Sequence, residues 1–324
     1  MPKYIGDQLV LDKTIFIMSP PRSGSTLFRN MLNGHPKLYS PPELYLLPYD
    51  TMKQRAAAYR APSKQYLKKG LIQTFAELYE MTYQEAAALT KGLEDQDAST
   101  IEAYALIQSQ IGDDVLVDKT PSNVGNLSNL LMAVERFDKP IFFHLYRHPY
   151  SAVDSYLRQA SRDFKLSKKT FGKVRHKKAQ LQAEQTWINC HMHALKLQDL
   201  VPRNRYIQVC YESLVETPEY EMRRICKKLN LRFSKAMLDP YRDSNETRKA
   251  IRKNKGKDKK IQKHFPLGDP GFYGHKSIDK KTAQKWRTLR LPQPVSEATT
   301  ILAESMGYEL PEFEEEYRYL VHSS

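Results

Sequence analysis

Four short runs of apolar residues occur along this chain, and stretches with helical spacing lie between them. The runs are Thr14–Ser19, Val115–Val117, Ile141–Leu145 and Tyr206–Cys210. Short apolar runs bounded by polar residues are typical of strands that are buried on both faces of a sheet. Because helical segments separate the runs, the pattern predicts an α/β fold in which helices flank a central parallel sheet.

The segments between the strands predict particular helices. Residues 57–110 are rich in Ala, Leu, Glu and Gln and lack a strand pattern, which predicts a helical insertion or flap after the first strand. Ser122 is predicted to cap a helix over Asn123–Phe137, and a long helix is predicted over Ala179–Leu200. Since the chain has no internal repeat and no low-complexity linker, we expect residues 1–324 to form a single domain.

The composition is that of a folded protein. Hydrophobic residues make up 40% of the chain, and its aromatic residues include 20 Tyr and 12 Phe, which excludes a disordered chain. Cys190, Cys210 and Cys226 form no CxxC pair, so we expect reduced cysteines rather than a disulfide framework or a metal site. Without a secretory signal or a long apolar stretch, a cytoplasmic protein with no membrane span is expected, although the chain could equally be one domain of a longer polypeptide.

The positive charge is concentrated in two places. The net charge is 51 − 37 = +14, and Arg162–Lys178 and Asn245–Lys263 each contribute +7. A uniformly basic nucleic-acid-binding surface would spread this charge, so we expect no nucleic-acid partner. The two segments are better explained as basic loops beside a polyanionic ligand or an acidic partner protein. Solvated loops that only aid solubility remain an alternative.

A turn rich in Gly and Ser follows the first predicted strand. Arg22-Ser23-Gly24-Ser25-Thr26 runs directly into a segment with apolar residues at helical spacing. A strand, a tight turn and a helix start direct several backbone N–H groups at one point, which favours phosphate or sulfate. The turn lacks the Lys of a nucleoside-triphosphate P-loop, and Arg22 supplies a positive charge instead. A tight connection without a ligand is the alternative.

Arg147 and Ser155 follow the third predicted strand. Arg147 is expected at the carboxyl edge of the sheet, where ligands bind in open α/β folds, and Ser155 lies eight residues further on. The pair could hold a second anionic group. Considered alone, however, the pattern favours the alternative, a helix-start Arg and a surface Ser without a ligand.

These two elements together resemble those of the sulfotransferases that use 3′-phosphoadenosine-5′-phosphosulfate (PAPS). In that family PRSGST, here Pro21–Thr26, binds the 5′-phosphosulfate, and the Arg and Ser at Arg147 and Ser155 bind the 3′-phosphate. A Tyr-Glu pair, here Tyr211-Glu212, has its Tyr near the adenine. The resemblance implies a three-layer, P-loop-like α/β fold, PAPS as co-substrate, PAP as product, and no metal.

The resemblance is closer to the sulfotransferase domains of cyanobacterial polyketide and olefin synthases. It is carried by Gly34–Tyr49 and by the stretch Gly268–Trp286. Those domains sulfonate the β-hydroxyl of an acyl chain on an acyl carrier protein, ahead of thioesterase-linked decarboxylation to a terminal alkene. This implies an acyl carrier protein as partner and a thioesterase as a neighbouring domain. A sulfotransferase for a free small alcohol, phenol or carbohydrate stays open, as do a nucleotide kinase and a nucleic-acid binder.

The resemblance also implies roles at the reacting centre. Arg22, Ser25 and Thr26 suit the 5′-phosphate side, and Lys119, after the second strand, matches a Lys near the bridging oxygen in related enzymes. Glu43 matches the catalytic base of the synthase-associated enzymes.

Another branch of the sulfotransferases uses His as the base, so His35 and His275 are rivals to Glu43. The basic residues 245–276 are expected to border the nucleotide. Five insertion residues are candidate acceptor lining: Tyr59, Tyr66, Phe75, Leu78 and Tyr79.

Overall fold

A five-stranded parallel sheet forms the centre of the protein. The computed structural model describes residues 3–5, 8–163, 172–242 and 272–311. The strand order is β4-β5-β3-β6-β7, and every neighbouring pair is parallel. The strands are β3 (Thr14–Met18), β4 (Leu38–Tyr39), β5 (Val115–Asp118), β6 (Ile141–Tyr146) and β7 (Tyr206–Cys210). The four strands predicted from apolar runs are confirmed, and β4 is an additional short strand at the edge of the sheet.

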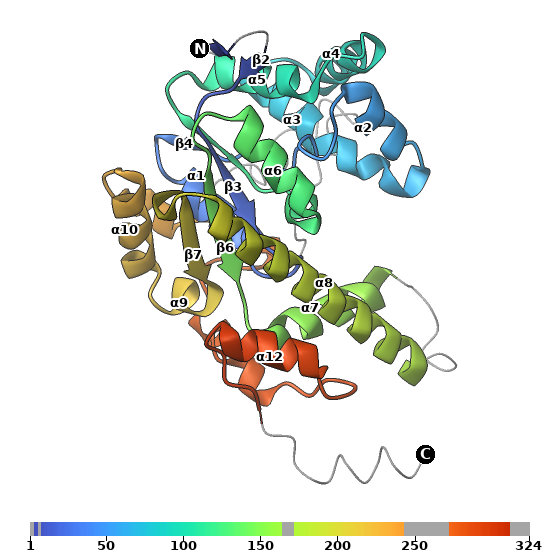
Figure 1. Ribbon diagram of the computed structural model, residues 1–324, viewed down its shortest axis with the longest axis vertical. Coiled ribbons are helices and arrows are strands. Elements are labelled where there is room, and N and C mark those ends of the chain that lie inside the picture. The colour runs from blue at the N-terminus through green and yellow to red at the C-terminus, as the bar shows by residue number, and fades with distance from the viewer. Residues whose placement is uncertain (1–2, 6–7, 164–171, 243–271, 312–324) are drawn as a thin grey trace, which may run out of the picture.

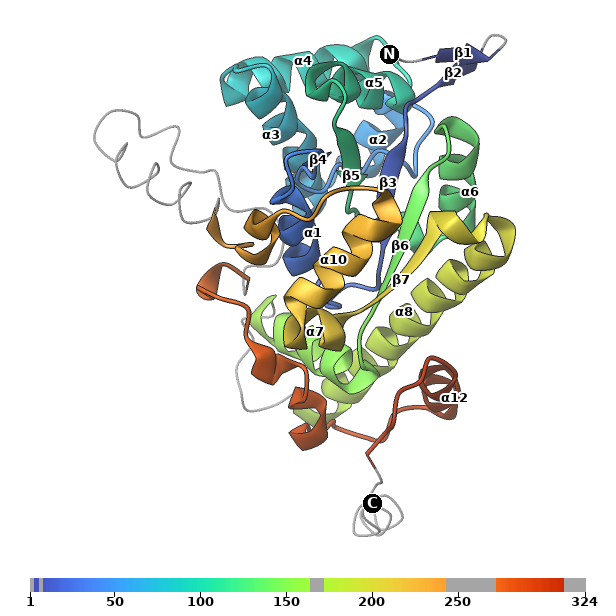
Figure 2. The ribbon, with the colours of Figure 1, turned by 90° about the vertical axis from the view of Figure 1, so that its left-hand side faces the viewer.

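Helices cover both faces of this sheet, which makes the architecture a three-layer one (Figure 2). One face packs on α1 (Ser25–Asn33), α9 (Tyr211–Glu216) and α10 (Pro218–Leu229). The other packs on α6 (Leu127–Arg136), α8 (Gly172–Leu200) and the insertion.

Successive residues of β3 point to opposite faces of the sheet. Phe16 and Met18 lie in one hydrophobic core, whereas Ile15 and Ile17 lie in the other, as the two-residue period of a strand requires. Both faces of the sheet are thus covered by apolar side chains and helices, and the predicted α/β fold class is confirmed.

The helical insertion lies between β4 and β5, at the top of Figure 1. It consists of α2 (Met52–Ala58), a 3-10 helix (Pro62–Lys68), α3 (Lys69–Leu78), α4 (Tyr83–Asp95) and α5 (Thr100–Ile111). Reciprocal capping boxes fix the starts of α4 and α5, where Thr82 pairs with Glu85 and Ser99 with Glu102. The prediction of helices in this region is confirmed.

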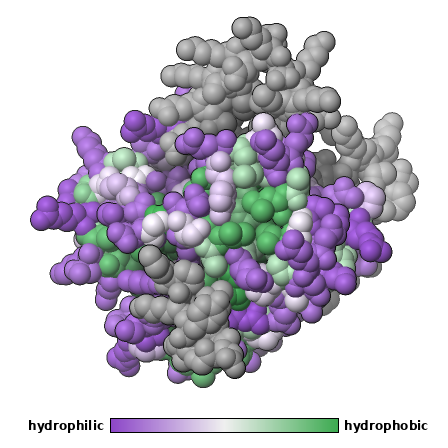
Figure 3. Space-filling view, turned by 90° about the horizontal axis from the view of Figure 1, so that it is seen from above, coloured by the Kyte–Doolittle hydropathy of each residue, from purple (hydrophilic) through white to green (hydrophobic). Residues whose placement is uncertain are grey.

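Viewed from the end where the insertion lies, hydrophobic residues gather at the middle of the surface and hydrophilic residues surround them (Figure 3). Ile72, Leu89 and Leu93 are among the insertion residues that pack against the core while staying partly exposed.

The remaining described segments complete the molecule. An antiparallel pair, β1 (Lys3–Ile5) and β2 (Gln8–Val10), precedes β3. Helix α7 (Pro149–Asp163) follows β6, and α12 (Glu297–Ser305) packs on α8 at the opposite end from the insertion (Figure 1). No helix in the described part of the chain has both the length and the apolar character to span a membrane.

One predicted helix begins at a different residue. Pro121–Gly125 forms a 3-10 helix, and α6 begins at Leu127, where the Asn126 side chain accepts a hydrogen bond from the Ser128 amide. Ser122 therefore does not cap α6. Pro121 starts the earlier turn because its fixed φ suits the first helical position, and this delays the α-helix by one turn.

Candidate active site

The Gly/Ser turn connects β3 to α1 in a conformation that depends on glycine. Gly24 is the N-cap of α1 with φ 86°, a left-handed conformation that favours glycine. A Cβ added to Gly24 would lie 2.3 Å from ring atoms of Tyr211. Ser23, Ser25 and Thr26 are all buried around this turn. The first amides of α1 and its positive end are therefore held beside the Tyr211 ring, as an anion-binding turn requires.

The second predicted element lies directly against the first. The Arg22 Nε donates a hydrogen bond to Ser155 Oγ at 3.1 Å, and Arg147 Nη1 donates to the Arg22 carbonyl oxygen at 3.1 Å. The Arg147 guanidinium also lies over the Tyr211 ring, 4.2 Å from its centroid. Two motifs that are 133 residues apart in sequence thus form one cationic cluster at the carboxyl edge of the sheet.

Glu212 makes hydrogen bonds next to this cluster. Its Oε1 accepts a hydrogen bond from the His148 amide at 3.1 Å, and its Oε2 accepts one from the Tyr308 hydroxyl at 2.9 Å. The neighbouring Tyr211 hydroxyl donates to Thr282 Oγ1 at 3.2 Å. The Tyr-Glu pair therefore ties the turn after Arg147 to the C-terminal part of the fold. The sequence singled out Tyr211 as a site residue and did not assign this positioning contact to Glu212.

Two buried polar atoms of the cluster are suited to bind an anion. Ser23 Oγ and Arg147 Nε have no hydrogen-bond partner among the described residues. Unpaired buried donors cost free energy, and native structures contain few of them without a reason such as a ligand. Phosphate oxygens would satisfy both atoms, so the residues present fit the expected nucleotide.

Glu43 and Lys119 meet at the same edge of the sheet, where β5 lies next to β3. Lys119 directly follows β5, and its Nζ forms an ion pair with Glu43 Oε1. Tyr45 donates a hydrogen bond to Glu43 Oε2 at 2.7 Å. The side chain of Lys119 is 3% exposed and that of Glu43 is 21% exposed. A buried cation thus lies beside a carboxylate that solvent or a substrate can reach.

The surroundings of Glu43 favour its ionised form. Burial alone would raise its pKa, but Lys119, the hydrogen bond from Tyr45 and nearby Arg29 together hold the pKa below its usual value. Burial lowers the pKa of Lys119, and the charge of Glu43 opposes that shift. At neutral pH the Glu43 carboxylate is therefore able to accept a proton.

Arg29 is a cation of this site that the sequence did not identify. It lies on α1, is buried, and donates from Nη1 to the Ser40 carbonyl oxygen at 2.8 Å and from Nη2 to Asn30 Oδ1 at 2.9 Å. Its position in the sequence could have identified it, because Arg29 is a charged residue within a helix whose neighbouring residues, Leu27, Phe28 and Met31, are buried.

The predicted rivals of Glu43 lie in different surroundings. His35 is buried, donates from Nε2 to the Arg232 carbonyl oxygen at 2.8 Å and accepts the Lys37 amide at Nδ1. Both ring nitrogens of His35 thus make hydrogen bonds to backbone groups. His275 is exposed, with its ring 6.5 Å from that of Tyr241.

The candidate acceptor-lining residues divide into two groups. Tyr59 and Phe75 are buried, and Leu78 and Tyr79 pack partly against the core, whereas Tyr66 is 58% exposed. The basic segment Asn245–Lys263 lies outside the described residues, as do residues 164–171 of the segment Arg162–Lys178. Among the described residues, no group of three or more His, Cys, Asp or Glu side chains is arranged to hold a metal ion.

Comparisons with known proteins cover nearly the whole chain. Residues 14–235 match the sequence model of a group described as the sulfotransferase family. The sulfotransferase domain from the Synechococcus PCC 7002 olefin synthase is 33% identical, with a TM-score of 0.78 over 94% of this chain and 98% of that domain. A sulfotransferase domain from the curacin biosynthetic pathway is also 33% identical, with a TM-score of 0.77 over 93% of this chain and 100% of that domain. No curated protein matches the sequence.

Proposed function

Because the chain belongs to the sulfotransferase family, we propose that it transfers a sulfuryl group from PAPS to the β-hydroxyl of an acyl chain on an acyl carrier protein. The observation that carries this proposal is the meeting of three elements at one edge of the sheet. They are the phosphate-binding turn with Arg22, the Arg147–Ser155 element, and the Glu43–Lys119 pair. We also propose that residues 1–324 work as one sulfotransferase domain.

PAPS supplies the sulfuryl group on its 5′-phosphate and carries a further phosphate at the 3′ position. We assign the 5′-phosphate side to Arg22 and to the turn Ser23–Thr26, and the 3′-phosphate to Arg147 and Ser155. The unpaired Ser23 Oγ and Arg147 Nε support this assignment. Tyr211, which packs on Gly24 and under Arg147, is assigned to the nucleoside side.

In the proposed transfer, Glu43 takes the proton of the acceptor hydroxyl, whose oxygen forms a bond to sulfur. The bond from sulfur to the 5′-phosphate oxygen breaks, and PAP leaves. Lys119 stabilises the negative charge that develops on the leaving oxygen, and such a fixed donor is typically worth about 10²–10³ in rate. By analogy with phosphoryl transfer, the remaining catalysis is positioning of the two substrates.

The carrier-bound acceptor is supported by the end-to-end similarity to the two synthase-pathway domains. A sulfated β-hydroxyl is a good leaving group, which would prepare the acyl chain for decarboxylative elimination to a terminal alkene, with a thioesterase domain as possible neighbour.

The charge around the acceptor side supports an acidic carrier as well. Residues 51–76 contain six Lys or Arg and no acidic residue. Lys53, Arg60, Lys64 and Lys69 among them are exposed. A segment with several exposed basic residues steers acidic partners by complementary charge. Docking by Arg162–Lys178 remains a second prediction.

The test compares two acceptors that share one acyl chain. The protein is incubated with PAPS and either a β-hydroxyacyl carrier protein or the same β-hydroxyacyl group on a short thiol, and both products are weighed by mass spectrometry. We expect the carrier to gain one SO3 and to react faster than the short thioester. Equal rates on the short thioester or on simple alcohols would favour the free-acceptor alternative. Failure of PAP to bind at all would contradict the assignment of the donor site.

A further inference from the structure

The residue two positions after Glu43 has an unusual backbone conformation. Tyr45 has φ 52°, in the left-handed region that residues with a Cβ rarely adopt. This conformation lies in the loop that follows the proposed base. From the same residue, the Tyr45 hydroxyl donates a hydrogen bond to Glu43 Oε2 at 2.7 Å. A strained residue persists only where its surroundings hold it, so the contacts of this turn call for explanation.

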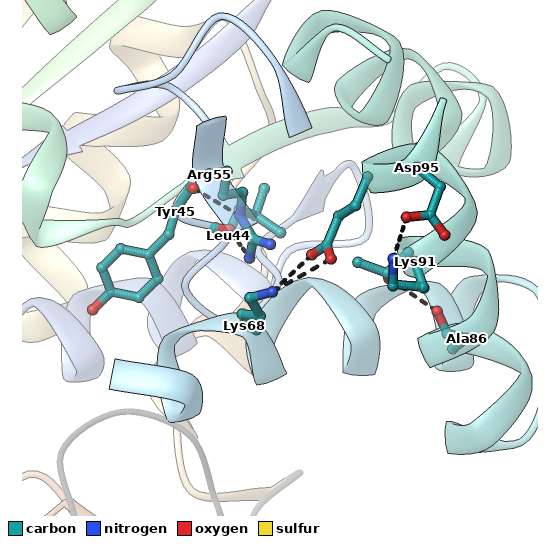
Figure 4. A network of polar contacts seen from close by, with 9 residues as sticks. Leu44, Tyr45, Arg55, Lys68, Ala86, Lys91 and Asp95 are labelled. Carbon is teal, nitrogen blue, oxygen red and sulfur yellow. Dashed lines mark hydrogen bonds and ion pairs between the residues drawn. The ribbon is translucent and has the colours of Figure 1, made fainter. Parts of the chain in front are cut away.

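A buried arginine from the helical insertion holds the turn. Arg55, on α2, is completely buried, and its Nε donates to the Tyr45 carbonyl oxygen at 2.9 Å while Nη2 donates to the Leu44 carbonyl oxygen at 3.1 Å (Figure 4). Burying a guanidinium is costly unless its donors are used. Two successive backbone carbonyl groups accept from Nε and Nη2 here, and both belong to the turn that carries Tyr45. The remaining Nη1 has no hydrogen-bond partner among the described residues.

The same turn is held from its other side by the end of β5. Thr120 Oγ1 accepts a hydrogen bond from the Leu44 amide at 3.2 Å and itself donates to Asp118 Oδ1 at 2.6 Å. Asp118 is fully buried and also accepts hydrogen bonds from Tyr104 and Asn123. The amide and carbonyl groups of the turn are therefore both fixed, one set by the sheet and the other by the insertion.

We infer that Tyr45 is a positioning residue for Glu43, and that Arg55 acts through it. This rests on the proposed function, in which Glu43 is the base. Lys119 contacts one carboxylate oxygen of Glu43 and Tyr45 contacts the other. In the proposed transfer Lys119 also serves the leaving oxygen, so its hold on Glu43 weakens as the donor binds. The hydroxyl of Tyr45 is the contact that keeps the carboxylate oriented towards the acceptor.

Several groups determine the proton affinity of Glu43. Lys119 and Arg29 favour the carboxylate by charge, and Tyr45 favours it by its hydrogen bond. Helix α3 packs against the Glu43 backbone through Gly70, and its exposed first residue, Lys69, adds a further cation on that side.

The ring of Tyr45 lies 5.8 Å from that of Tyr59, and both Tyr59 and Tyr66 act on its hydroxyl electrostatically. Neither phenol is among the groups that shift the pKa of Glu43. Of these three tyrosines, Tyr45 is therefore the one whose hydroxyl contacts the Glu43 carboxylate.

The test is Tyr45→Phe, which removes the hydroxyl and keeps the ring. We expect the transfer rate at saturating substrates to fall about 10- to 100-fold, the loss typical of a hydrogen bond to a charged group, with PAP affinity unchanged. The acidic limb of the pH–rate profile should move to higher pH, because the carboxylate loses a donor. Tyr49→Phe is the matched control, since Tyr49 packs on Tyr59 in the same cluster and its side chain is hydrogen-bonded to Tyr59 rather than to Glu43.

A second measurement needs no donor or acceptor. The carboxylate of Glu43 is titrated by infrared difference spectroscopy of the wild type against Glu43→Gln, and the titration is repeated in the Tyr45→Phe background. We expect a higher pKa for Glu43 in that background. Arg55→Lys should change rate and pH profile in the same direction, and should add little in the double variant because both residues act through one contact.

The outcomes separate this inference from the proposed function. An inactive Glu43→Gln together with a Tyr45→Phe variant of unchanged rate, pH profile and Glu43 titration would overturn the inference alone. Wild-type transfer by Glu43→Gln would instead overturn the role of Glu43 itself.

Discussion

Individual residues at this site combine burial with charge, and each depends on a particular neighbour. Lys119 is almost fully buried yet contacts Glu43, and Arg147 lies on the ring of Tyr211. Gly24 matters because it has no side chain, which lets the Tyr211 ring pack against the turn. The anion binding that we propose here therefore requires space as well as charge.

Gly24→Ala tests that requirement. The new methyl group would meet the Tyr211 ring at 2.3 Å, in a backbone conformation with φ 86° that disfavours Ala. We expect PAP affinity, measured by calorimetry, to fall at least tenfold, and the midpoint of thermal unfolding to fall as well. Gly125→Ala is the control, because no heavy atom lies within 4 Å of the added Cβ there. Wild-type PAP affinity in Gly24→Ala would show that the turn does not need the close approach of Tyr211.

Among the elements, the strands could be predicted well because a doubly covered strand is apolar throughout. The exceptions have physical reasons. β4 has only two residues, Leu38 and Tyr39, which is too few for a hydrophobic pattern. The start of α6 was misjudged because Ser122 and Asn126 are both good caps, and Pro121 decides between them by starting a 3-10 turn first.

The contact between α3 and the loop of Glu43 provides the prediction at this scale. A Cβ on Gly70 would lie 2.0 Å from the Glu43 carbonyl oxygen, so Gly70→Ala must push α3 and the loop apart. We expect a loss of about 1–3 kcal/mol in the free energy of unfolding, as for other overpacked sites, and a slower sulfuryl transfer.

Gly92→Ala, inside α4, is the matched control. No atom lies within 4 Å of its added Cβ, so the better helix propensity of Ala should stabilise the protein by about 0.5–1 kcal/mol. Denaturant unfolding of both variants checks the pair. Equal unfolding curves and equal activities for Gly70→Ala and the wild type would contradict the packing argument.

For the molecule as a whole, the order of motifs along the chain identified the family, and this resemblance is confirmed. The site roles of Glu43, Lys119, Arg147 and Ser155 remain predictions, now supported by the ion pair of Glu43 with Lys119 and by the hydrogen bonds that join Arg22 to Ser155 and Arg147. Contacts such as those of Arg55 with Tyr45 could not be predicted, because they join distant segments through backbone atoms that leave no residue pattern.

The core also contains a buried chain of titratable groups. His144 Nδ1 lies 2.7 Å from the Tyr206 hydroxyl, and its Nε2 lies 2.7 Å from His191 Nδ1. Both histidines are fully buried, and burial lowers the pKa of His144 to about 3 and that of His191 well below its usual value. The unfolded chain therefore binds more protons than the folded protein below about pH 6.5.

We accordingly expect the free energy of unfolding to decrease as the pH falls from about 6.5 towards 3. Each such histidine contributes a slope of at most about 1.4 kcal/mol per pH unit. His144→Gln, which cannot titrate, should reduce the slope by up to that amount, whatever it does to stability at neutral pH. Urea unfolding at a series of pH values measures both slopes, and identical slopes would show that His144 is not protonated on unfolding.

The most direct test of the central claim measures transfer and donor binding on the same two samples, the wild type and Glu43→Gln. With PAPS and a β-hydroxyacyl carrier protein, we expect the wild type to add one SO3 per carrier. Glu43→Gln should bind PAP with similar affinity yet transfer about 10²–10⁴ times more slowly, as loss of a general base predicts. A Glu43→Gln variant that transfers at the wild-type rate would contradict the assignment of Glu43 and of this edge of the sheet as the reacting centre.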